Sequence, residues 1–553
     1  MVTVAKELAL NEHFATTWEA IADAYPGDPA IIYGTRVWTW SEFDDRASRL
    51  AAAMTAAGVG VGDTVAIDLY NCGEYLETFY AALKIRAVPA NVNYRYLDDE
   101  MLHLLEQAEA RVLAHHASFA SRVAPAIAAL PGLRLVIEVD NLGGTRPPDA
   151  GTVGYEALIA GHGPAPRIER PGSDVFLSFT GGTTGLPKGV EYVVGNSVNN
   201  TDVLARLNLG ITDLDWSAPS IERARQLREA YPPPVALPAS PMMHSTGLIM
   251  ASLPVLTLGG TVISLTAPHF DADELFTAVA RHRPSTVSIV GDAFARPMLR
   301  ALDRQAATGA PYDTSSLVTI TSAGVAWSGQ VKVHLLEHIP QVTLVDACGS
   351  SEGAAIGSQV TRRGEPASTD RFVPGAGLRL LRTDDSLIPA DSREIGLFLL
   401  PTGCRGYRND PERTARAFRT IDGQRYVLPG DWGRWNEDGT ITLIGRRTST
   451  INTGGEKVFP EEVQQVVLLN EDIEDCLVLG VPDERFGQRV AAIVQPVAGR
   501  TVDPDEVTRF VHDRLAGYKA PRTVIVATVP RGPNGKALFK EARKMLEDTA
   551  AAR

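Results

Sequence analysis

Short apolar segments alternate with amphipathic helical segments along most of this chain of 553 residues. The expected strands span residues 65–69, 112–114, 135–139, 175–179, 262–265, 286–290, 318–321 and 344–345. Strands that alternate with helices are typical of parallel sheets, because a parallel connection needs a crossover. The alternation predicts an α/β protein with mainly parallel sheets, and the chain is too long for one compact core.

Thr39 is expected to begin a helix. Thr39 and Glu42 have the spacing of a capping box, and an apolar stripe with helical period follows until Gly58, which is placed to end the helix. Further helices are expected at residues 75–83 and 221–230, and the Gly- and Pro-rich residues 141–163 are predicted to cross between subdomains. The chain becomes more charged after Gly445, which predicts a large N-terminal domain of several subdomains at 1–445 and a small C-terminal domain at 446–553.

Charge and cysteine usage exclude several classes of protein. A net charge of −13 disfavours a nucleic-acid partner held through phosphate contacts. No run approaches the roughly 20 apolar residues of a membrane span, and the N-terminus has no signal-peptide core. The four cysteines lie far apart and form no CxxC pair, so we expect reduced thiols in a cytoplasmic protein. The sequence leaves a homo-oligomer open.

A glycine- and threonine-rich segment, SFTGGTTGLPKGV at residues 178–190, directly follows an expected strand. Glycines allow backbone N–H groups to surround phosphate oxygens, while threonine hydroxyls and one lysine add donors and charge. The segment is not a Walker loop, because Pro187 and Gly189 flank its lysine. A flexible surface loop would not account for so many donors. The expected phosphate contacts are Thr180, Gly181, Gly182, Thr183, Thr184 and Lys188.

Further motifs follow this segment in a fixed order. They are PMMHSTG at 241–247, CGSSE at 348–352, GDWG at 430–433, GGEKVFPEE at 454–462 and Gly535-Lys536. With these motifs the chain resembles, over essentially its whole length, the adenylate-forming superfamily, which includes acyl-CoA synthetases, peptide-synthetase adenylation domains and firefly luciferase. The resemblance implies an enzyme that uses ATP, Mg²⁺ and coenzyme A on a small-molecule carboxylic acid, and a C-terminal α+β domain that moves.

The resemblance also implies roles for single residues around the nucleotide. Glu352 matches the Mg²⁺ ligand, as a hard carboxylate oxygen suits that cation beside phosphates. The implied contacts are Ser351 to the α-phosphate, Asp431 and Arg446 to the ribose, and Asp346 and Gly324 to adenine. A structural salt bridge is the alternative for Asp431 and Arg446. Cys348 departs from the family pattern, which commonly has an aromatic residue stacked on adenine at this position.

Two residues are implied in the chemistry itself. His244 matches a residue that borders the reacting carboxylate, and a packed, hydrogen-bonded histidine is the alternative. Lys536 matches the lysine of the first half-reaction, in which a carboxylate attacks the α-phosphate of ATP. An ammonium group between these two anions offsets their repulsion. The alternative for Lys536 is a solvated lysine in a basic C-terminal segment.

Acyl-CoA synthetases of this superfamily rotate the C-terminal domain between their two half-reactions. The hinge matches Thr448, where relatives carry Asp or Lys. A hinge need not be a particular residue type, so the rotation is still expected here. Gly454, Gly455 and Glu456 would then border the pantetheine channel of coenzyme A.

The identity of the carboxylic acid substrate is the part of the function that the sequence predicts least well. Residues 91–96, 291–297, 349–352 and 451–457 resemble actinobacterial synthetases for bulky polycyclic acids, such as steroid or diterpenoid carboxylates. Residues 209–237, with Trp216 and Tyr231, either shape a wide acyl pocket or form a surface excursion. A medium- or long-chain fatty acid CoA ligase, a stand-alone adenylation enzyme that loads a carrier protein, and a silent scaffold are the other hypotheses.

Overall fold

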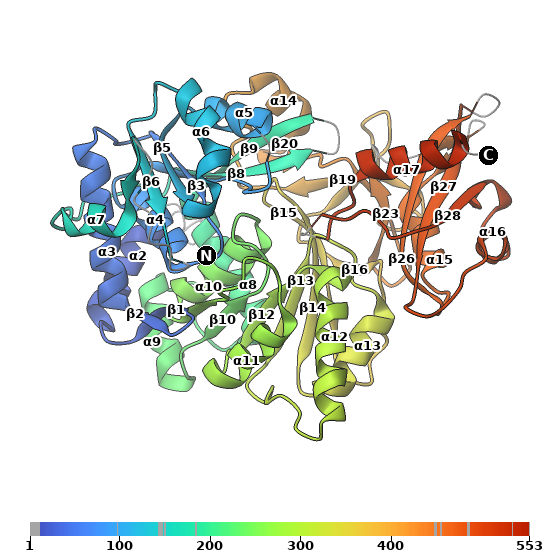
Figure 1. Cartoon of the computed structure of the whole chain (residues 1–553), viewed down its shortest axis with the longest axis horizontal. Coiled ribbons are helices and arrows are strands. Elements are labelled where there is room, and N and C mark those ends of the chain that lie inside the picture. The colour runs from blue at the N-terminus through green and yellow to red at the C-terminus, as the bar shows by residue number, and fades with distance from the viewer. Residues whose placement is uncertain are drawn as a thin grey trace.

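The computed structural model describes residues 12–96, 98–141, 148, 151–182, 185–446, 451–453, 456–483, 487–532 and 535–551. In this part of the chain the strands form three sheets of seven, sixteen and five strands. The first two belong to the N-terminal part of the chain, and the third lies beside them in Figure 1. No helix among the described residues is long and apolar enough to span a membrane.

The seven-stranded sheet has the order β7-β6-β5-β3-β4-β8-β9 and is parallel except for β9. Its strands are β3 (Thr64–Asp68), β4 (Val88–Asn91), β5 (Ala110–His116), β6 (Leu135–Val139), β7 (Val153–Gly154), β8 (Val175–Gly182) and β9 (Gly185–Val193). The helices connecting or flanking them are α3 (Trp40–Ala56), α4 (Gly73–Lys84), α5 (Asp98–Ala108), α6 (Ala120–Ala129) and α7 (Tyr155–Ala160). The predicted crossing at 141–163 is wrong, because β7 pairs with β6 and keeps this segment at the edge of the same sheet.

The sixteen-stranded sheet has a parallel part and an antiparallel part. The parallel part is β1 (Pro29–Tyr33), β10 (Val235–Pro238), β11 (Thr261–Ser264), β12 (Thr286–Ile289), β13 (Thr319–Ala323) and β14 (Thr343–Ser350). The antiparallel strands are β2 (Arg36–Thr39), β15 (Ala354–Thr361), β16 (Arg371–Pro374), β17 (Arg379–Leu381), β18 (Leu387–Ile388), β19 (Gly396–Pro401), β20 (Phe418–Ile421), β21 (Gln424–Val427), β22 (Asp431–Trp435) and β23 (Ile441–Arg446). Helices α11 (Ala272–His282), α12 (Gly291–Ala307) and α13 (Gly329–His338) pack on the parallel part through a buried apolar cluster.

Five further helical elements surround the two N-terminal sheets. They are α2 (Phe14–Ala24), α8 (Val194–Leu209), α9 (Ser220–Ala230), α10 (Leu253–Thr257) and α14 (Pro411–Ala417). A π-helix, η2 (Thr246–Ser252), directly precedes α10. This mixture of helices and mainly parallel sheets confirms the predicted α/β class.

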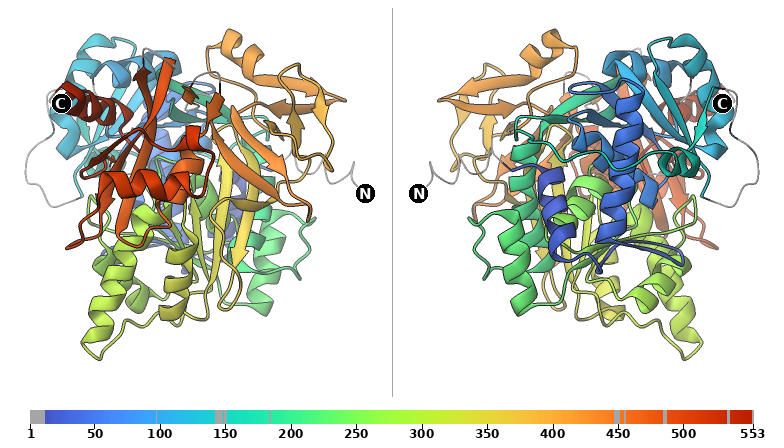
Figure 2. Two further views of the ribbon diagram at one scale, coloured as in Figure 1. Left: turned by 90° about the vertical axis from the view of Figure 1, so that its right-hand side faces the viewer. Right: turned by 90° about the vertical axis from the view of Figure 1, so that its left-hand side faces the viewer.

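The C-terminal sheet is antiparallel except for the pair β27 and β28. It contains β24 (Ile451–Thr453), β25 (Glu456–Val458), β26 (Ile473–Asp483), β27 (Gly487–Pro496) and β28 (Thr523–Val526). Its helices are α15 (Pro460–Val467), α16 (Pro504–His512) and α17 (Phe539–Ala551). Figure 2 shows this small α+β unit packed against one side of the N-terminal part.

All eight expected strands are confirmed to within a few residues. The capping box is also confirmed: Thr39 caps the backbone N–H of Glu42, and the Glu42 side chain returns a bond to the backbone of Thr39. The expected helices at 75–83 and 221–230 correspond to α4 and α9. Local periodicity and local hydrogen bonds were sufficient to predict these elements from the sequence.

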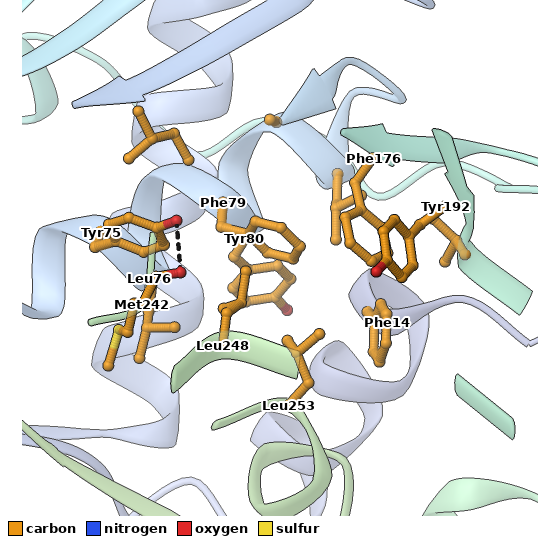
Figure 3. Close-up of a cluster of buried hydrophobic side chains, with 14 of the residues drawn as sticks. Phe14, Tyr75, Leu76, Phe79, Tyr80, Phe176, Tyr192, Met242, Leu248 and Leu253 are labelled. Carbon is orange, nitrogen blue, oxygen red and sulfur yellow. Dashed lines mark hydrogen bonds between the residues drawn. The ribbon is translucent and has the colours of Figure 1, made fainter. Parts of the chain in front are cut away.

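An aromatic core joins the two N-terminal sheets. Figure 3 shows its labelled side chains, which come from α2, α4, strands β8 and β9 and the segment that runs from Met242 into α10: Phe14, Tyr75, Leu76, Phe79, Tyr80, Phe176, Tyr192, Met242, Leu248 and Leu253. The Tyr75 hydroxyl donates to the Met242 carbonyl oxygen at 3.1 Å. This bond ties α4 to the segment that carries His244.

Candidate active site

The predicted site residues gather at the carboxyl ends of parallel strands. Gly324 follows β13, Ser351 and Glu352 follow β14, and His244 follows β10 by a few residues. Thr180 lies near the carboxyl end of β8 in the other sheet. Ligands of open parallel sheets bind at this edge, so the strand directions alone bring these residues together.

The predicted phosphate segment is a β-hairpin. Thr180 in β8 lies opposite Lys188 in β9, and the pairing extends to Gly182 opposite Gly185. Thr183 and Thr184, which join the two strands, lie outside the described residues. Gly189 is required for packing, because an added Cβ would approach the Phe179 ring to 2.7 Å.

Lys188, Glu352 and Tyr407 form a closed triangle of polar contacts. The Lys188 ammonium lies 2.6 Å from Glu352 Oε1 and 2.9 Å from the Tyr407 hydroxyl, which itself donates to Glu352 Oε1 at 2.6 Å. The ammonium also lies 4.6 Å from the centre of the Tyr407 ring. Tyr407 was not predicted, because nothing in its local sequence links it to residues 55 and 219 positions earlier.

Glu352 is buried yet remains acidic. Burial alone would raise its pKa, but the Lys188 charge and the bonds from Lys188 and Tyr407 outweigh burial and lower the pKa. The backbone of its turn is fixed from two sides: the Tyr192 hydroxyl donates to the Ser351 carbonyl, and the Thr402 hydroxyl donates to the Glu352 carbonyl, both at 2.6 Å. The carboxylate is therefore ionised and held in place beside the hairpin that is predicted to bind phosphate.

The predicted adenine contacts lie around β13 and β14. Gly324 has φ +92° and faces open space, since an added Cβ would meet nothing within 4 Å. Asp346 is buried and pairs with the buried ammonium of Lys332 at 2.7 Å, and burial raises its pKa to about 6 despite this charge. Lys332 also donates to the Gln359 side chain and the Ser368 carbonyl. One carboxylate oxygen of Asp346 is thus engaged by a lysine that the sequence did not predict.

Asp431 and Arg446 are neighbours across two strands. Asp431 begins β22, Arg446 ends β23, and their Cα atoms are direct partners in the antiparallel register. Asp431 is buried, and the Arg446 side chain lies outside what the structure describes. The expected hinge and channel residues Thr448, Gly454 and Gly455 also lie outside the described residues, whereas the Glu456 backbone begins β25.

His244 is half-buried at the start of the turn that leads into the π-helix η2. Its Nε2 atom is buried and has no hydrogen-bond partner among the described residues. Burial, together with the positive charges of Lys536 and Arg95, lowers the pKa of His244 to about 3. The neutral imidazole therefore lies in the field of two cations, one of which belongs to the C-terminal unit.

Two asparagines that the sequence did not predict hold the His244 segment against the seven-stranded sheet. Asn71 donates to the carbonyls of Pro238 and Ser240 and accepts from the Met242 N–H. Asn91 is buried, accepts from the Phe179 N–H at 2.6 Å and donates to the Met243 carbonyl. Each amide bridges the two N-terminal sheets, so the position of His244 depends on both.

The segment 209–237 enters the sixteen-stranded sheet only at its end, where β10 begins, and the part before β10 packs mainly on itself and on neighbouring helices. Trp216 and Tyr231 join a small apolar cluster with Leu209, Leu227 and Leu258. The Tyr231 hydroxyl donates to Asp213 within the same segment. This arrangement favours the surface-excursion interpretation over a direct contribution of Trp216 and Tyr231 to an acyl pocket.

The chain belongs to the AMP-binding enzyme family. The family model described as AMP-binding enzyme matches residues 18–396, and the model of the AMP-binding enzyme C-terminal domain matches residues 462–536.

Several similar proteins are named as CoA ligases. The chain is 34% identical over 544 residues to the 3-oxocholest-4-en-26-oate–CoA ligase of Rhodococcus rhodochrous, with 97% of this chain and 96% of that protein covered. It is 32% identical to a medium/long-chain-fatty-acid–CoA/3-oxocholest-4-en-26-oate–CoA ligase of Mycobacterium tuberculosis, with 98% and 97% covered. The fold resembles the crystal structure of an anthranilate CoA ligase in complex with anthranoyl-AMP, with a TM-score of 0.82, 20% identity and 99% of each chain covered.

Proposed function

We propose that this AMP-binding enzyme is an ATP-dependent acyl-CoA synthetase for a bulky polycyclic carboxylic acid of the steroid or diterpenoid class. The observation that carries the proposal is the convergence of the phosphate hairpin, Glu352, His244 and the charge of Lys536 on one edge of the sheets. The substrate class is supported by full-length relatives named for a steroid acid at more than 30% identity.

In the first half-reaction, a carboxylate oxygen of the acid would attack the α-phosphorus of ATP, and the bond to pyrophosphate would break. Lys536 would lie between the two anions and stabilise the charge that develops on the transferring group. His244 stays neutral across the ordinary pH range, so it can border the carboxylate without adding a charge. In the second half-reaction the thiol of coenzyme A would displace AMP from the acyl-adenylate.

We assign the remaining nucleotide contacts by position in the fold. Thr180, Lys188 and the glycines of the hairpin would hold the β- and γ-phosphates, and Ser351 the α-phosphate. Asp431 and Arg446 would hold the ribose, and the adenine would lie between Gly324 and Asp346. With Cys348 at the usual aromatic position, polar contacts would dominate adenine binding.

The donor set suits a magnesium ion that is shared with ATP. The described residues contain no cluster of three or more metal-binding side chains, and Mg²⁺ beside nucleotides is commonly held by one or two carboxylates and phosphates. Glu352 supplies such a carboxylate and already attracts a cation, the Lys188 ammonium at 2.6 Å. Glu352 would hold the ion, which would neutralise phosphate charge.

A change of sheet supports the proposed domain division. Arg446 is the last residue of β23 in the sixteen-stranded sheet, and Ile451 begins the C-terminal sheet. We divide the chain into an N-terminal domain at 1–445 and a mobile domain at 446–553, whose first residue, Arg446, is still paired in β23. The hinge would be Thr448, and Gly454, Gly455 and Glu456 would reach the coenzyme A channel after rotation. The four cysteines are free thiols, which suits the cytoplasm.

Pyrophosphate release with a panel of acids tests the proposed substrate class. We expect a steroid or diterpenoid carboxylate to support release with a kcat/KM at least ~10-fold above that of medium- and long-chain fatty acids, because a wide rigid ligand gains more from a matched pocket. Acyl-CoA formation would be followed by mass spectrometry with and without coenzyme A. A preference for fatty acids would contradict the proposed substrate class. Pyrophosphate release without any acylation of coenzyme A would favour a carrier protein as the acceptor. No release with any acid would contradict the proposal that the chain is an acid-activating enzyme.

Tyr407→Phe should weaken the use of Mg-ATP, because it removes one hydrogen bond to Glu352 and one to Lys188 while the ring stays in place. We expect a rise of about 5- to 20-fold in the KM for ATP at limiting Mg²⁺, consistent with the loss of a hydrogen bond to a charged group. Calorimetric titration with Mg-ATP gives the same comparison without turnover. An unchanged affinity would show that Tyr407 does not prepare the site. Tyr231→Phe, which removes a hydroxyl bond to Asp213 away from the hairpin, serves as the matched control.

A further inference from the structure

Arg531 makes a two-pronged ion pair inside the C-terminal unit. Its Nε atom lies 2.5 Å from Asp475 Oδ2, and its Nη2 atom lies 2.7 Å from Asp475 Oδ1. The third arm, Nη1, donates to the carbonyl oxygen of Gly535 at 2.9 Å. About a quarter of the side chain is exposed (26%). The guanidinium is held in one plane because it binds the Asp475 carboxylate and the Gly535 carbonyl oxygen at once.

These bonds surround the backbone of Lys536. Arg531 and Ala537 form an antiparallel bridge, and the Gly532 N–H donates to the Lys536 carbonyl at 2.8 Å. The Gly535 N–H donates back to the Gly532 carbonyl at 2.8 Å. Lys536 therefore follows a closed turn whose preceding carbonyl is held by Arg531, while the Lys536 side chain itself is exposed.

The same turn is pressed against the N-terminal domain. An added Cβ at Gly535, which has φ +73°, would overlap the Ala293 side chain at the start of α12. The neighbouring Asp292 accepts from the Ser328 backbone and hydroxyl at 2.9 and 2.8 Å, so its carboxylate is fixed. Asp292, Arg531 and Gly535 line one cleft of about 1120 Å³ between the two domains.

Carboxylates on both sides of this cleft also raise the pKa of Arg531. Burial lowers the pKa of Arg531, but the carboxylates of Asp475 and Asp292 outweigh burial and raise it. Asp475 belongs to β26 of the mobile domain, whereas Asp292 belongs to α12 of the N-terminal domain. The guanidinium is thus paired with a carboxylate of its own unit and lines the same cleft as a carboxylate of α12.

We propose that Arg531 is a positioning residue that orients the Lys536 turn for adenylate formation, with Asp475 as its anchor and Asp292 as its docking partner. The proposal rests on the proposed role of Lys536 in the first half-reaction. An ion pair that served folding alone would not need the third arm on the Gly535 carbonyl, and it would affect both half-reactions alike. A positioning role affects only the half-reaction that uses Lys536.

The test measures the two half-reactions separately in Arg531→Gln. We expect the kcat of adenylation, followed by pyrophosphate release, to fall about 10- to 100-fold, as for a catalytic group misplaced by about 1 Å. The KM values for ATP and for the acid should change by less than about threefold. Thioester formation from a supplied acyl-adenylate should be unchanged. Arg531→Lys keeps the positive charge but not the two parallel hydrogen bonds of the guanidinium. Its adenylation rate should lie between those of the wild type and the glutamine variant.

A double variant separates positioning from general damage. In the Lys536→Ala background there is no ammonium left to orient, so adding Arg531→Gln should cause less than about a twofold further loss of adenylation. Multiplied losses, an equal fall in both half-reactions, or no effect of Arg531→Gln would each overturn the proposal. Full adenylation by Lys536→Ala alone would instead contradict the proposed role of Lys536.

Two further variants guard against misfolding and against non-specific interface effects. Asp475→Asn keeps the arginine but loosens its anchor, so it should reproduce the selective loss with a folded protein, as checked by thermal unfolding. Arg300→Gln removes an exposed ion pair with Glu474 at 3.0 Å in the same cleft. Because exposed pairs contribute little, adenylation by this control should stay within about twofold of the wild type.

Discussion

Lys536→Ala is expected to reduce acyl-adenylate formation by about 10²–10³-fold while leaving thioester formation from a supplied acyl-adenylate intact. The Lys536 ammonium belongs to the C-terminal unit, and its charge contributes to the low pKa of His244. Without it, the acid carboxylate and the α-phosphate approach each other with less charge compensation. Pyrophosphate release measures the first half-reaction, and acyl-CoA formation measures the second.

The control for Lys536→Ala is a lysine on the same basic segment. Lys540 is exposed in the first turn of α17 and belongs to no proposed contact, so Lys540→Ala should leave both half-reactions within about twofold of the wild type. If Lys536→Ala lowered both half-reactions equally, the assignment of two domain arrangements to two steps would be wrong. If neither fell, Lys536 would have no role in the chemistry.

Glu352→Gln should cause the second large loss, of about 10²–10³-fold in kcat/KM for Mg-ATP. The amide is nearly isosteric, so the fold is expected to survive, but it lacks the charge that Mg²⁺ requires. It also leaves the Lys188 ammonium without the carboxylate that it contacts at 2.6 Å. Pyrophosphate release as a function of Mg²⁺ concentration, together with calorimetry of Mg-ATP and of ATP alone, measures the loss.

The two calorimetric titrations identify the cause of this effect. Binding of Mg-ATP should weaken strongly. ATP without metal should bind no more weakly than to the wild type, because the lost carboxylate would repel the phosphates and its loss frees the Lys188 ammonium for them. An equal weakening of both would mean that Glu352 acts through Lys188 and not on a metal. Glu191→Gln, which breaks the ion pair with Arg408 at 3.1 Å beside the same hairpin, is the matched control and should keep the Mg²⁺ dependence.

Much of the fold could be predicted from the sequence. The eight expected strands, the capping box of Thr39 and the α/β class depend on periodicity and on hydrogen bonds between residues a few positions apart. The glycine- and threonine-rich segment was also found, although its hairpin geometry was not. The destination of residues 141–163 was missed, because composition marks a connection without showing which strand it rejoins.

The sequence by itself determined the residue types at the site and their order, since each motif is short and local. Only the tertiary structure showed that Tyr407 joins Lys188 and Glu352, that Asn91 bridges two sheets, and that Arg531 holds the Gly535 carbonyl. Lys188 and Glu352 are 164 positions apart, and no local pattern encodes such a contact. Their proximity follows from strand directions that place the carboxyl ends of both sheets at one edge, which is a property of the folded sheets and not of any segment within them.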